Sequence, residues 1–380
     1  MVKKYRIAVL PGDGVGREVI PEALKVLDSA AEAVGGLDFD YVEVPCGGKY
    51  YLETGLEWPD DGFETCRGAD AILFGAVGWP KAVLPGGQLA GIGILLDLRF
   101  GLDLYANVRP AKLYDGVECF VKGKKAGDVD FVIVRENTEG LYAPIRGSLE
   151  RGGKREVAVD VRVLTRKGCE RVIDYAFRLC LSRMGAAVDG KRRVTCVDKS
   201  NVLEGCRFFR KVFDEVAEKY GSIEKDYVYV DAMTQWMIRT PERYDVIVTT
   251  NMFGDILSDL SSVLIGGMGM APSGNVGDEH AMFEPVHGSA PDIAGREVAN
   301  PIGAILSAKM MLEWLAQKHK DEACRKAAEA IERGVADVLA DGKIRTQDLC
   351  YGRYADVKPS KTSAVGDAIA QRIRNGKPAY

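Results

Sequence analysis

The hydrophobic and polar positions of this chain follow two periods that alternate along its length. Short apolar runs rich in β-branched residues predict strands at 6–10, 39–44 and 71–74. The amphipathic stretch at 15–33 lies between the first two runs and predicts a helix. Further apolar runs predict central strands at 131–134, 194–197, 227–230 and 246–249, each followed by helix-compatible sequence. This order predicts an α/β fold with a mixed or mostly parallel sheet and flanking helices.

The last third of the chain has a different pattern. Residues 266–277 are rich in glycine and predict a loop. Helical patterns then cover 302–315, 322–339 and 363–373. Glycine and charged residues cluster at 145–156 and predict a protruding loop or arm. Because no Pro- or Ser-rich linker is evident, we expect the domains to share an intimate boundary.

Composition narrows the class of protein. At roughly 150 residues per domain, 380 residues predict about two or three domains. Lysine and arginine total 51 against 55 aspartates and glutamates, so no basic excess favours nucleic acid. Apolar residues make up 47% of the chain, enough for a sizeable core, and this argues against disorder.

The cysteines and the apolar stretches indicate in which cellular compartment the protein works. The nine cysteines form no CxxC pair, which favours reduced thiols. The apolar run at 7–10 is too short for an export signal, and the stretch at 302–316 is interrupted by Lys309 and Glu313. We therefore expect a cytoplasmic protein with no membrane partner.

The first glycine cluster invites comparison with a dinucleotide-binding loop. Gly12, Gly14 and Gly16 follow a predicted strand and open a predicted helix. The Rossmann pattern, however, needs a glycine where Arg17 stands, and Asp13 would face a pyrophosphate with a negative charge. We interpret the cluster as a strand-to-helix turn that needs glycine backbone freedom.

Three arginines stand out near predicted strands, namely Arg99, Arg109 and Arg135. A guanidinium binds a carboxylate through two parallel hydrogen bonds. Each arginine taken alone is better explained by an ion pair at a strand end, but the three together indicate an anionic substrate.

Acidic residues and a lysine follow other strands. Asp255 and Asp259 are four residues apart on a predicted helix, so they share one face of it. Two carboxylates on one face suit Mg²⁺ or Mn²⁺. The alternative is that the dipole at the N-terminus of the helix favours acidic residues there. Lys199 and Asp231 each end a strand, where α/β sheets bind ligands. A surface lysine and a helix N-cap remain the alternatives for these two.

A polar, glycine-rich loop at 287–295 precedes Asn300 and a predicted helix, and it suits a nucleotide. No histidine and cysteine cluster has zinc spacing, which argues against a zinc alcohol-dehydrogenase mechanism.

Taken in order, these segments resemble the β-decarboxylating dehydrogenase family over nearly the whole chain. The family includes 3-isopropylmalate, isocitrate, homoisocitrate, tartrate and D-malate dehydrogenases. The matching segments are LPGDGVGREV, LRFGLDLYANVRP, VRENTEGLY, DKSNVL, the aspartate of YVDAMTQWM, NMFGDILSD, and EPVHGSAPDIAG followed by ANP.

The resemblance implies a doubly wound, two-domain fold of the isopropylmalate dehydrogenase type, which is not a Rossmann fold. Residues 1–104 and 266–380 are expected to form a discontinuous, large cofactor-binding domain. Residues 105–265 are expected to form a smaller domain with the metal and substrate residues, the dimer interface and the arm. The active site is expected in the cleft between the two domains, which closes over the substrate.

The implied reaction is the NAD(P)- and metal-dependent oxidation of a (2R)-hydroxy diacid, followed by loss of its β-carboxylate as carbon dioxide. The residues expected to bind the substrate carboxylates are Arg99, Arg109 and Arg135. The residues expected to bind Mg²⁺ or Mn²⁺ are Asp231, Asp255 and Asp259. Lys199 is the expected general base and Tyr142 the expected acid. In such relatives Lys199 and Asp231 reach in from a second subunit, which implies a homodimer with shared active sites.

Cofactor choice follows from Asp292. Its carboxylate can accept hydrogen bonds from a ribose 2'-hydroxyl but repels a 2'-phosphate. By the resemblance, relatives that use NADP have a lysine and a tyrosine at the positions of Asp292 and Ile293. We therefore predict NAD. The other cofactor contacts implied by the resemblance are His287, Gly288, Ser289, Ala290 and Asn300.

Substrate choice depends on the helix before Arg99. By this resemblance, isocitrate dehydrogenases have a serine and an asparagine at the positions of Gly93 and Leu95. Homoisocitrate dehydrogenases often have an arginine at the position of Leu96. The apolar pair Leu95 and Leu96 suits an alkyl group and cannot satisfy a third carboxylate. This favours 3-isopropylmalate, and hence leucine biosynthesis.

Two departures keep alternatives open. Many isopropylmalate enzymes have an acidic residue shortly before the leucine pair, but 91–93 reads Gly-Ile-Gly here. The segment at 75–80 resembles the tartrate and D-malate branch. D-malate, tartrate and homoisocitrate therefore remain alternative substrates. A non-catalytic regulatory subunit is disfavoured because Tyr142, Lys199 and the three aspartates are all present.

Overall fold

The computed structural model describes residues 2–376. They divide into two compact units. Unit 1 combines the chain up to Leu104 with Lys112–Ala126 and the chain from Ser262 onward. Unit 2 comprises Tyr105–Ala111 and Gly127–Ser261. The chain therefore leaves unit 1 and returns to it twice.

The segment Lys112–Ala126 departs from the predicted division, which assigns it to the smaller domain. It belongs to unit 1 because its long-range contacts lie there. The Arg345 guanidinium donates a 3.1 Å hydrogen bond to the carbonyl of Gly116, and the Tyr114 hydroxyl donates one of 3.0 Å to Glu332. Such contacts between distant segments leave no pattern in a single sequence.

The strands of unit 1 follow the order β2-β1-β3-β12-β11. Their bounds are β1 Lys3–Gly12, β2 Leu37–Glu43, β3 Ala71–Ala76, β11 Pro272–Val276 and β12 Ala281–Pro285. The pairs of β1 with β2, β1 with β3, and β12 with β3 are parallel, and β11 with β12 is antiparallel. Every residue of β3 is buried, as expected for a sheet covered by helices on both faces.

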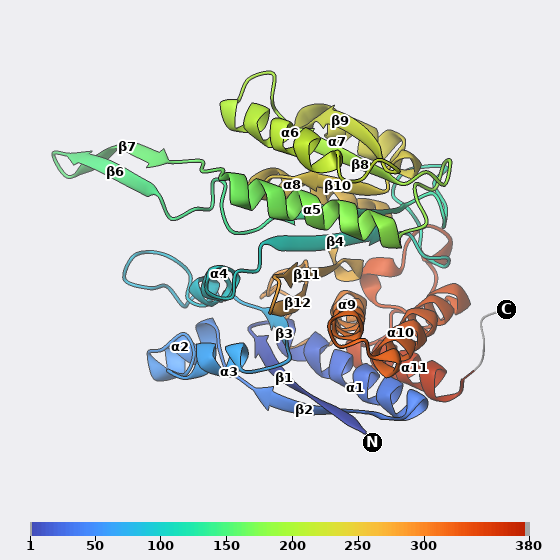
Figure 1. Ribbon diagram of the computed structural model, residues 1–380. Coiled ribbons are helices and arrows are strands. Elements are labelled where there is room, and N and C mark those ends of the chain that lie inside the picture. Colours follow the sequence, from blue (N-terminus) through green and yellow to red (C-terminus); the bar gives the residue numbers. More distant parts are fainter. Residues whose placement is uncertain (1, 377–380) are drawn as a thin grey trace. The chain divides into compact units, whose positions relative to one another are not determined.

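The helices of unit 1 lie against this sheet and against one another (Figure 1). Their bounds are α1 Gly16–Val34, α2 Gly48–Thr54, α3 Gly62–Arg67, α4 Ile92–Gly101, α9 Ile302–His319, α10 Glu322–Asp341 and α11 Thr362–Arg374. Helix α1 packs on α9, α10 and α11, and α9 packs on β11 and β12. In α1 the buried residues Val19, Ala23 and Val26 recur at helical spacing, which explains the amphipathic pattern of the sequence.

Unit 2 has strands in the order β4-β5-β10-β8-β9. Their bounds are β4 Ala106–Lys112, β5 Asp130–Glu136, β8 Arg193–Asp198, β9 Glu224–Tyr229 and β10 Val246–Thr249. The pairs of β5 with β10, β10 with β8, and β8 with β9 are parallel. The helices are α5 Arg166–Ser182, α6 Glu204–Ala217, α7 Val230–Arg239 and α8 Asn251–Ser262. Together the units confirm the predicted α/β fold.

A two-stranded hairpin extends from unit 2 where the sequence predicts an arm (Figure 1). It consists of β6 Arg146–Arg151 and β7 Lys154–Asp160, paired in antiparallel register. Every residue of both strands is exposed, including Leu149, Val157 and Val159. The hairpin thus presents apolar side chains that no other part of residues 2–376 covers.

The structure confirms the strands and helices predicted from the hydrophobic pattern, but the prediction of a loop at 266–277 is wrong in part. Residues Pro272–Val276 form β11, and all five are buried. The sequence PSGNV lacks both alternation and β-branched residues apart from its valine. Pairing with β12 and packing of α9 therefore determine this strand, rather than its own propensity.

The first glycine cluster forms a tight turn, as predicted. Gly12 and Gly14 have φ of +70° and +56°, in the left-handed region that favours glycine. A Cβ on Gly14 would lie 1.8 Å from the carbonyl oxygen of Ser289. The buried carboxylate of Asp13 accepts hydrogen bonds from the backbone N–H groups of Gly48 and Gly78 at 2.7 and 3.0 Å. The Asp13 carboxylate thus connects this turn to the loops at Gly48 and Gly78.

Among residues 2–376, no helix combines the length and the apolar character needed to cross a membrane. In α9, Lys309 forms ion pairs with Glu313 at 2.9 Å and Glu332 at 3.4 Å. All the cysteines are free thiols, as the sequence predicts.

Candidate active site

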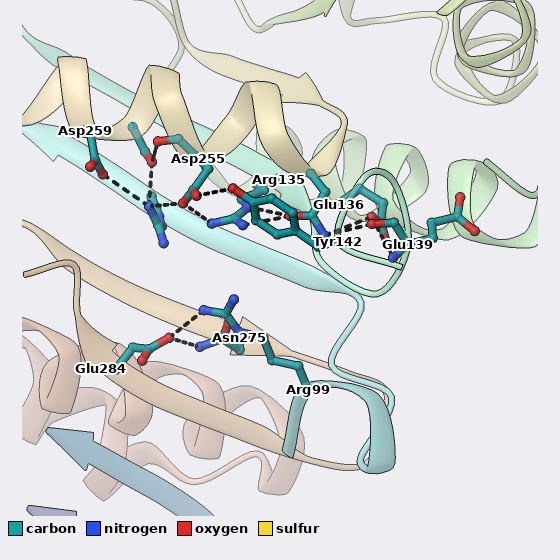
Figure 2. A network of polar contacts seen from close by, with 12 residues as sticks. Arg99, Arg135, Glu136, Glu139, Tyr142, Asp255, Asp259, Asn275 and Glu284 are labelled. Atoms are coloured by element: carbon teal, nitrogen blue, oxygen red, sulfur yellow. Dashed lines mark hydrogen bonds and ion pairs between the residues drawn. The ribbon is translucent and has the colours of Figure 1, made fainter. Parts of the chain in front are cut away.

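Two buried arginines meet two aspartates along helix α8 (Figure 2). Arg135 is near the end of β5, opposite Thr249 of β10, and α8 begins two residues after Thr249. The Arg135 guanidinium donates a short hydrogen bond to Asp255 Oδ1. Arg109 Nη1 lies 3.4 Å from Asp255 Oδ1 and 3.6 Å from Asp259 Oδ1. Arg109 thus supplies a cation between two aspartates that would otherwise repel each other across one helical turn.

Burial and exposure differ sharply within this cluster. The Arg135 side chain is 1% exposed and that of Arg109 is 9% exposed, whereas the Asp259 side chain is 55% exposed. Partial burial raises the pKa of the Asp259 carboxyl, the Arg109 guanidinium lowers it, and Asp255 raises it. The cluster therefore combines fixed buried cations with carboxylate oxygens that solvent can reach.

Tyr142 completes the cluster from the loop after β5. Its hydroxyl donates a 2.8 Å hydrogen bond to Asp255 Oδ2, and the Arg135 guanidinium lies 5.5 Å from the centre of its ring. Partial burial, and then the bond to Asp255, raise the pKa of the Tyr142 phenol. The phenol therefore holds its proton at neutral pH.

Asn251, which the sequence analysis did not single out, fixes Arg135. Its Oδ1 accepts hydrogen bonds from Arg135 Nε at 3.1 Å and Nη2 at 2.7 Å. Its Nδ2 donates to the carbonyl of Glu139 at 3.0 Å. Gly254 permits the approach, because a Cβ there would lie 2.6 Å from Cβ of Arg135. Asn251 opens the quoted motif NMFGDILSD but is uncharged, so only its position in the motif could have indicated it.

We expect Asn251→Ala to lower the free energy of unfolding by about 2 kcal/mol, since it removes the acceptor of two charge-assisted hydrogen bonds from a buried guanidinium. Urea unfolding of the purified variant measures this change. Asn375→Ala, at an exposed position after α11, is the matched control and should change stability little. An Asn251→Ala variant as stable as the control would show that Arg135 does not depend on this amide.

Lys199 and Asp231 form a second pair within unit 2. Lys199 directly follows β8, and Asp231 lies in the first turn of α7, directly after β9. Lys199 Nζ lies 2.7 Å from Asp231 Oδ1. The hydrogen bond from Lys199 lowers the pKa of the Asp231 carboxyl. The strand order places β8 and β9 side by side, so the two predicted residues meet.

The three aspartates predicted to bind a metal do not form one cluster within a single chain. Among residues 2–376, no group of three or more histidine, cysteine, aspartate or glutamate side chains is arranged to hold a metal ion. Asp255 and Asp259 lie together on α8, while Asp231 pairs with Lys199. Two of the three predicted ligands thus lie together on α8, and the third lies apart from them in the isolated chain.

Arg99 is held in unit 1 by residues that sequence reasoning missed. Its Nη2 donates a 3.0 Å hydrogen bond to Glu284 Oε1, which also accepts one of 2.8 Å from Asn275 Nδ2 (Figure 2). Glu284 stands at the start of the quoted motif EPVHGSAPDIAG, whereas Asn275 lies in the strand that was predicted as a loop. The Arg99 Nε atom is buried and has no hydrogen-bond partner among the described residues.

The leucines before Arg99 differ in their surroundings. Leu95 packs against a core cluster that contains Leu98, Ile94 and Phe74. Leu96 is not part of that cluster and is half-buried. Of the two residues predicted to form an apolar wall, Leu96 is the one more available to a ligand.

The predicted cofactor residues lie in the loop between β12 and α9. His287 Nε2 is buried without a hydrogen-bond partner among residues 2–376, and burial lowers the pKa of this imidazole. Asp292 and Gly288 are exposed, Ile293 is half-buried, and Ala290 has a φ of +40°.

Two residues of this loop are already bound within the chain. The Ser289 hydroxyl donates to the carbonyl of Gly78 at 2.5 Å, and Asn300 Nδ2 donates to Asp348 Oδ2 at 3.0 Å. Asn300 Oδ1 also accepts the backbone N–H of Ile302 at 3.0 Å, which fixes the start of α9. These contacts hold the shape of the loop that would carry a nucleotide.

Arg135, Lys199 and Asp231 thus lie at or next to the ends of parallel strands, where α/β enzymes bind their ligands. The family model described as isocitrate/isopropylmalate dehydrogenase matches residues 6–369. The chain therefore belongs to the isocitrate/isopropylmalate dehydrogenase family, and it is an oxidoreductase.

Relatives with different substrates match almost the full length. A 3-isopropylmalate/3-methylmalate dehydrogenase of Methanocaldococcus jannaschii is 43% identical, over 97% of this chain and 99% of its own. A decarboxylating D-malate dehydrogenase of Escherichia coli K12 is 41% identical, over 98% and 99%. The crystal structure of isocitrate dehydrogenase from Methylococcus capsulatus matches with a TM-score of 0.84 at 37% identity, over 97% of this chain and 99% of that chain.

Proposed function

We propose that this protein is an NAD- and Mg²⁺- or Mn²⁺-dependent dehydrogenase that oxidises and decarboxylates a (2R)-hydroxy diacid, with 3-isopropylmalate as its substrate. The observation that carries the proposal is the cluster on α8, where Arg109, Arg135 and Tyr142 surround Asp255. Buried guanidinium groups, a phenol and carboxylates in contact are the groups that binding and decarboxylation of a diacid require.

The donor set of this cluster suits a divalent cation. Asp255 and Asp259 lie on one face of α8, and their carboxylate oxygens are the ligands that Mg²⁺ and Mn²⁺ prefer. Asp231 of a second copy would supply the third carboxylate. When bound, the cation polarises the substrate oxygen and stabilises the negative charge that develops there. Arg99, Arg109 and Arg135 bind the substrate carboxylates.

Proton transfers are assigned to Lys199 and Tyr142. Lys199 Nζ accepts the proton of the substrate hydroxyl as hydride leaves the carbon, and the Asp231 carboxylate 2.7 Å away orients the amine. The Tyr142 hydroxyl donates its proton to the carbon that has lost carbon dioxide. A tyrosine phenol is protonated at neutral pH, so it has a proton to give.

The loop at 287–300 is assigned to NAD. His287 offers a buried ring nitrogen without a partner in the described chain, as an imidazole awaiting a ligand contact would. The exposed Asp292 carboxylate can accept hydrogen bonds from a ribose 2'-hydroxyl and would repel a 2'-phosphate. These features support NAD over NADP.

The substrate is assigned from the helix that carries Arg99. Leu96 is half-buried and apolar, so it suits the isopropyl group and leaves a third carboxylate unsatisfied. The M. jannaschii relative, a 3-isopropylmalate/3-methylmalate dehydrogenase, supports the same substrate. The E. coli relative makes D-malate the second candidate. With 3-isopropylmalate as substrate, the enzyme would serve leucine biosynthesis, in the cytoplasm that free thiols favour.

We further propose a homodimer in which each active site takes residues from both copies. The β6–β7 hairpin is fully exposed, and an isolated two-stranded hairpin is marginally stable in water, so a covering partner would stabilise it. Trp236 of α7 and Ile256 of α8 are 44% and 53% exposed. A second copy that covers these side chains could bring its Lys199 and Asp231 to α8.

A substrate panel tests the proposed reaction. With Mg²⁺ or Mn²⁺ and NAD⁺, we expect kcat/KM for 3-isopropylmalate to exceed that for D-malate by at least tenfold, because burying an isopropyl group is worth about 2 kcal/mol. The measurement is NADH formation with 3-isopropylmalate, D-malate, tartrate, isocitrate and homoisocitrate. Preference for a smaller acid would favour the malate and tartrate branch. Equal or better use of NADP⁺ would overturn the assignment of NAD.

A further inference from the structure

A carboxylate from a distant segment lies at the start of α4. Glu57, in the loop between α2 and α3, accepts a 2.5 Å hydrogen bond at Oε1 from the backbone N–H of Gly91. Its Oε2 would lie 3.3 Å from a Cβ on Gly93, so the absence of a side chain at Gly93 makes room for it. The backbone carbonyl of Glu57 accepts the N–H of Gly47 at 2.9 Å, which anchors the loop. The acidic group that 91–93 lacks is thus supplied by Glu57.

This carboxylate lies at one end of a strip along α4. Gly93, Leu96 and Arg99 follow at intervals of three residues, so they are neighbours on one face of the helix. At the other end, Arg99 is 6% exposed and its Nε has no partner in the described part of the chain. Figure 2 shows the Arg99 side chain extending from α4 towards Glu284. The face therefore presents a carboxylate, an apolar side chain and a guanidinium in that order.

We propose that Glu57 excludes substrates with a third carboxylate from this enzyme. The inference rests on the proposed function, in which Arg99 binds a substrate carboxylate and Leu96 faces the substituent. A substituent that extends along the strip away from Arg99 approaches Glu57. An isopropyl group ends on Leu96, whereas the additional carboxylate of isocitrate or homoisocitrate meets a fixed negative charge. Such repulsion is an effective means of rejecting a related ligand.

Glu57 also removes an alternative binding group. The N–H groups at the start of a helix attract anions, and Gly91 offers its N–H at this point. Because Glu57 occupies that N–H, a substrate carboxylate cannot use it. The carboxylate of Glu57 therefore acts against a third carboxylate both by repulsion and by occupying a donor.

The test is calorimetric titration of isocitrate and D-malate into the purified enzyme in the presence of Mn²⁺. Glu57→Gln keeps the hydrogen-bond acceptor for Gly91 and removes only the charge. We expect it to strengthen isocitrate binding at least tenfold and to leave D-malate binding within twofold, since D-malate has no substituent to reach Glu57. Glu57→Ala, which also frees the N–H of Gly91, should give a gain at least as large. Glu53→Gln, at an exposed position on α2, is the matched control and should change neither ligand.

The outcomes separate this inference from the function on which it rests. Unchanged isocitrate affinity in both Glu57 variants, with D-malate still bound, would overturn the role of Glu57 alone. An equal gain for both ligands would also overturn it, because it would indicate a general effect on binding. If neither wild type nor variants bound any of the acids, the proposed function would fail and this inference with it.

Discussion

Asp255→Asn is expected to lower kcat/KM about a thousandfold, because it removes a charge on which three functional groups depend. Asp255 receives hydrogen bonds from Arg135 and Tyr142 and lies 3.4 Å from Arg109 Nη1. A neutral amide is a poor ligand for Mg²⁺ or Mn²⁺ and cannot balance two buried guanidinium groups. Loss of several kcal/mol of stabilisation of the transition state corresponds to this factor, since each 1.36 kcal/mol is about tenfold.

The measurement pairs steady-state kinetics with titration of Mn²⁺ into the variant. We expect the variant to lose nearly all activity and to bind Mn²⁺ at least tenfold more weakly than the wild type. Asp60→Asn, at an exposed position in unit 1, is the control and should behave as wild type. A folded Asp255→Asn enzyme that kept a tenth of its activity would contradict the assignment of Asp255 as a metal ligand.

The hydrophobic pattern predicted most of the fold because burial follows chemistry that the sequence displays. Every residue of β8 and β10 is buried, and apolar residues dominate the predicted runs 194–197 and 246–249. Strand β11 escaped prediction for the opposite reason. Its residues have little intrinsic preference for a strand. They form one because they pair with β12 and pack against α9.

Some residues of the candidate site could be predicted because they are charged and lie at or near the end of a predicted strand. The sequence analysis singled out Arg135, Asp255, Lys199 and Asp231, and the structure brings Arg135 to Asp255 and Lys199 to Asp231. Their roles in binding and catalysis stay predictions. Residues that act by holding others were not predictable in this way. Asn251 is uncharged, and Glu57 is remote in sequence from the helix start that it contacts. Their roles depend on distances that only the folded chain sets.

Sharing of the active site between two copies can be tested without a structure of the dimer. In a single chain, Lys199 contacts Asp231, while Asp255 contacts Arg135 and Tyr142. If each site combines Lys199 of one copy with Asp255 of the other, then a chain that lacks Lys199 still supplies a functional α8. Likewise, a chain that lacks Asp255 still supplies a functional lysine to its partner.

We therefore expect the inactive variants Lys199→Met and Asp255→Asn to restore activity when they are combined in one dimer. Each mixed dimer contains one site with both lesions and one site with neither, so it should show about half of wild-type turnover. Co-expression with two different affinity tags and sequential purification isolates the mixed dimer, and NADH formation measures its activity. Both parent homodimers should stay inactive. If Lys199 and Asp255 serve the same site from one chain, both sites of the mixed dimer carry a lesion, and its activity would stay at the level of the parents.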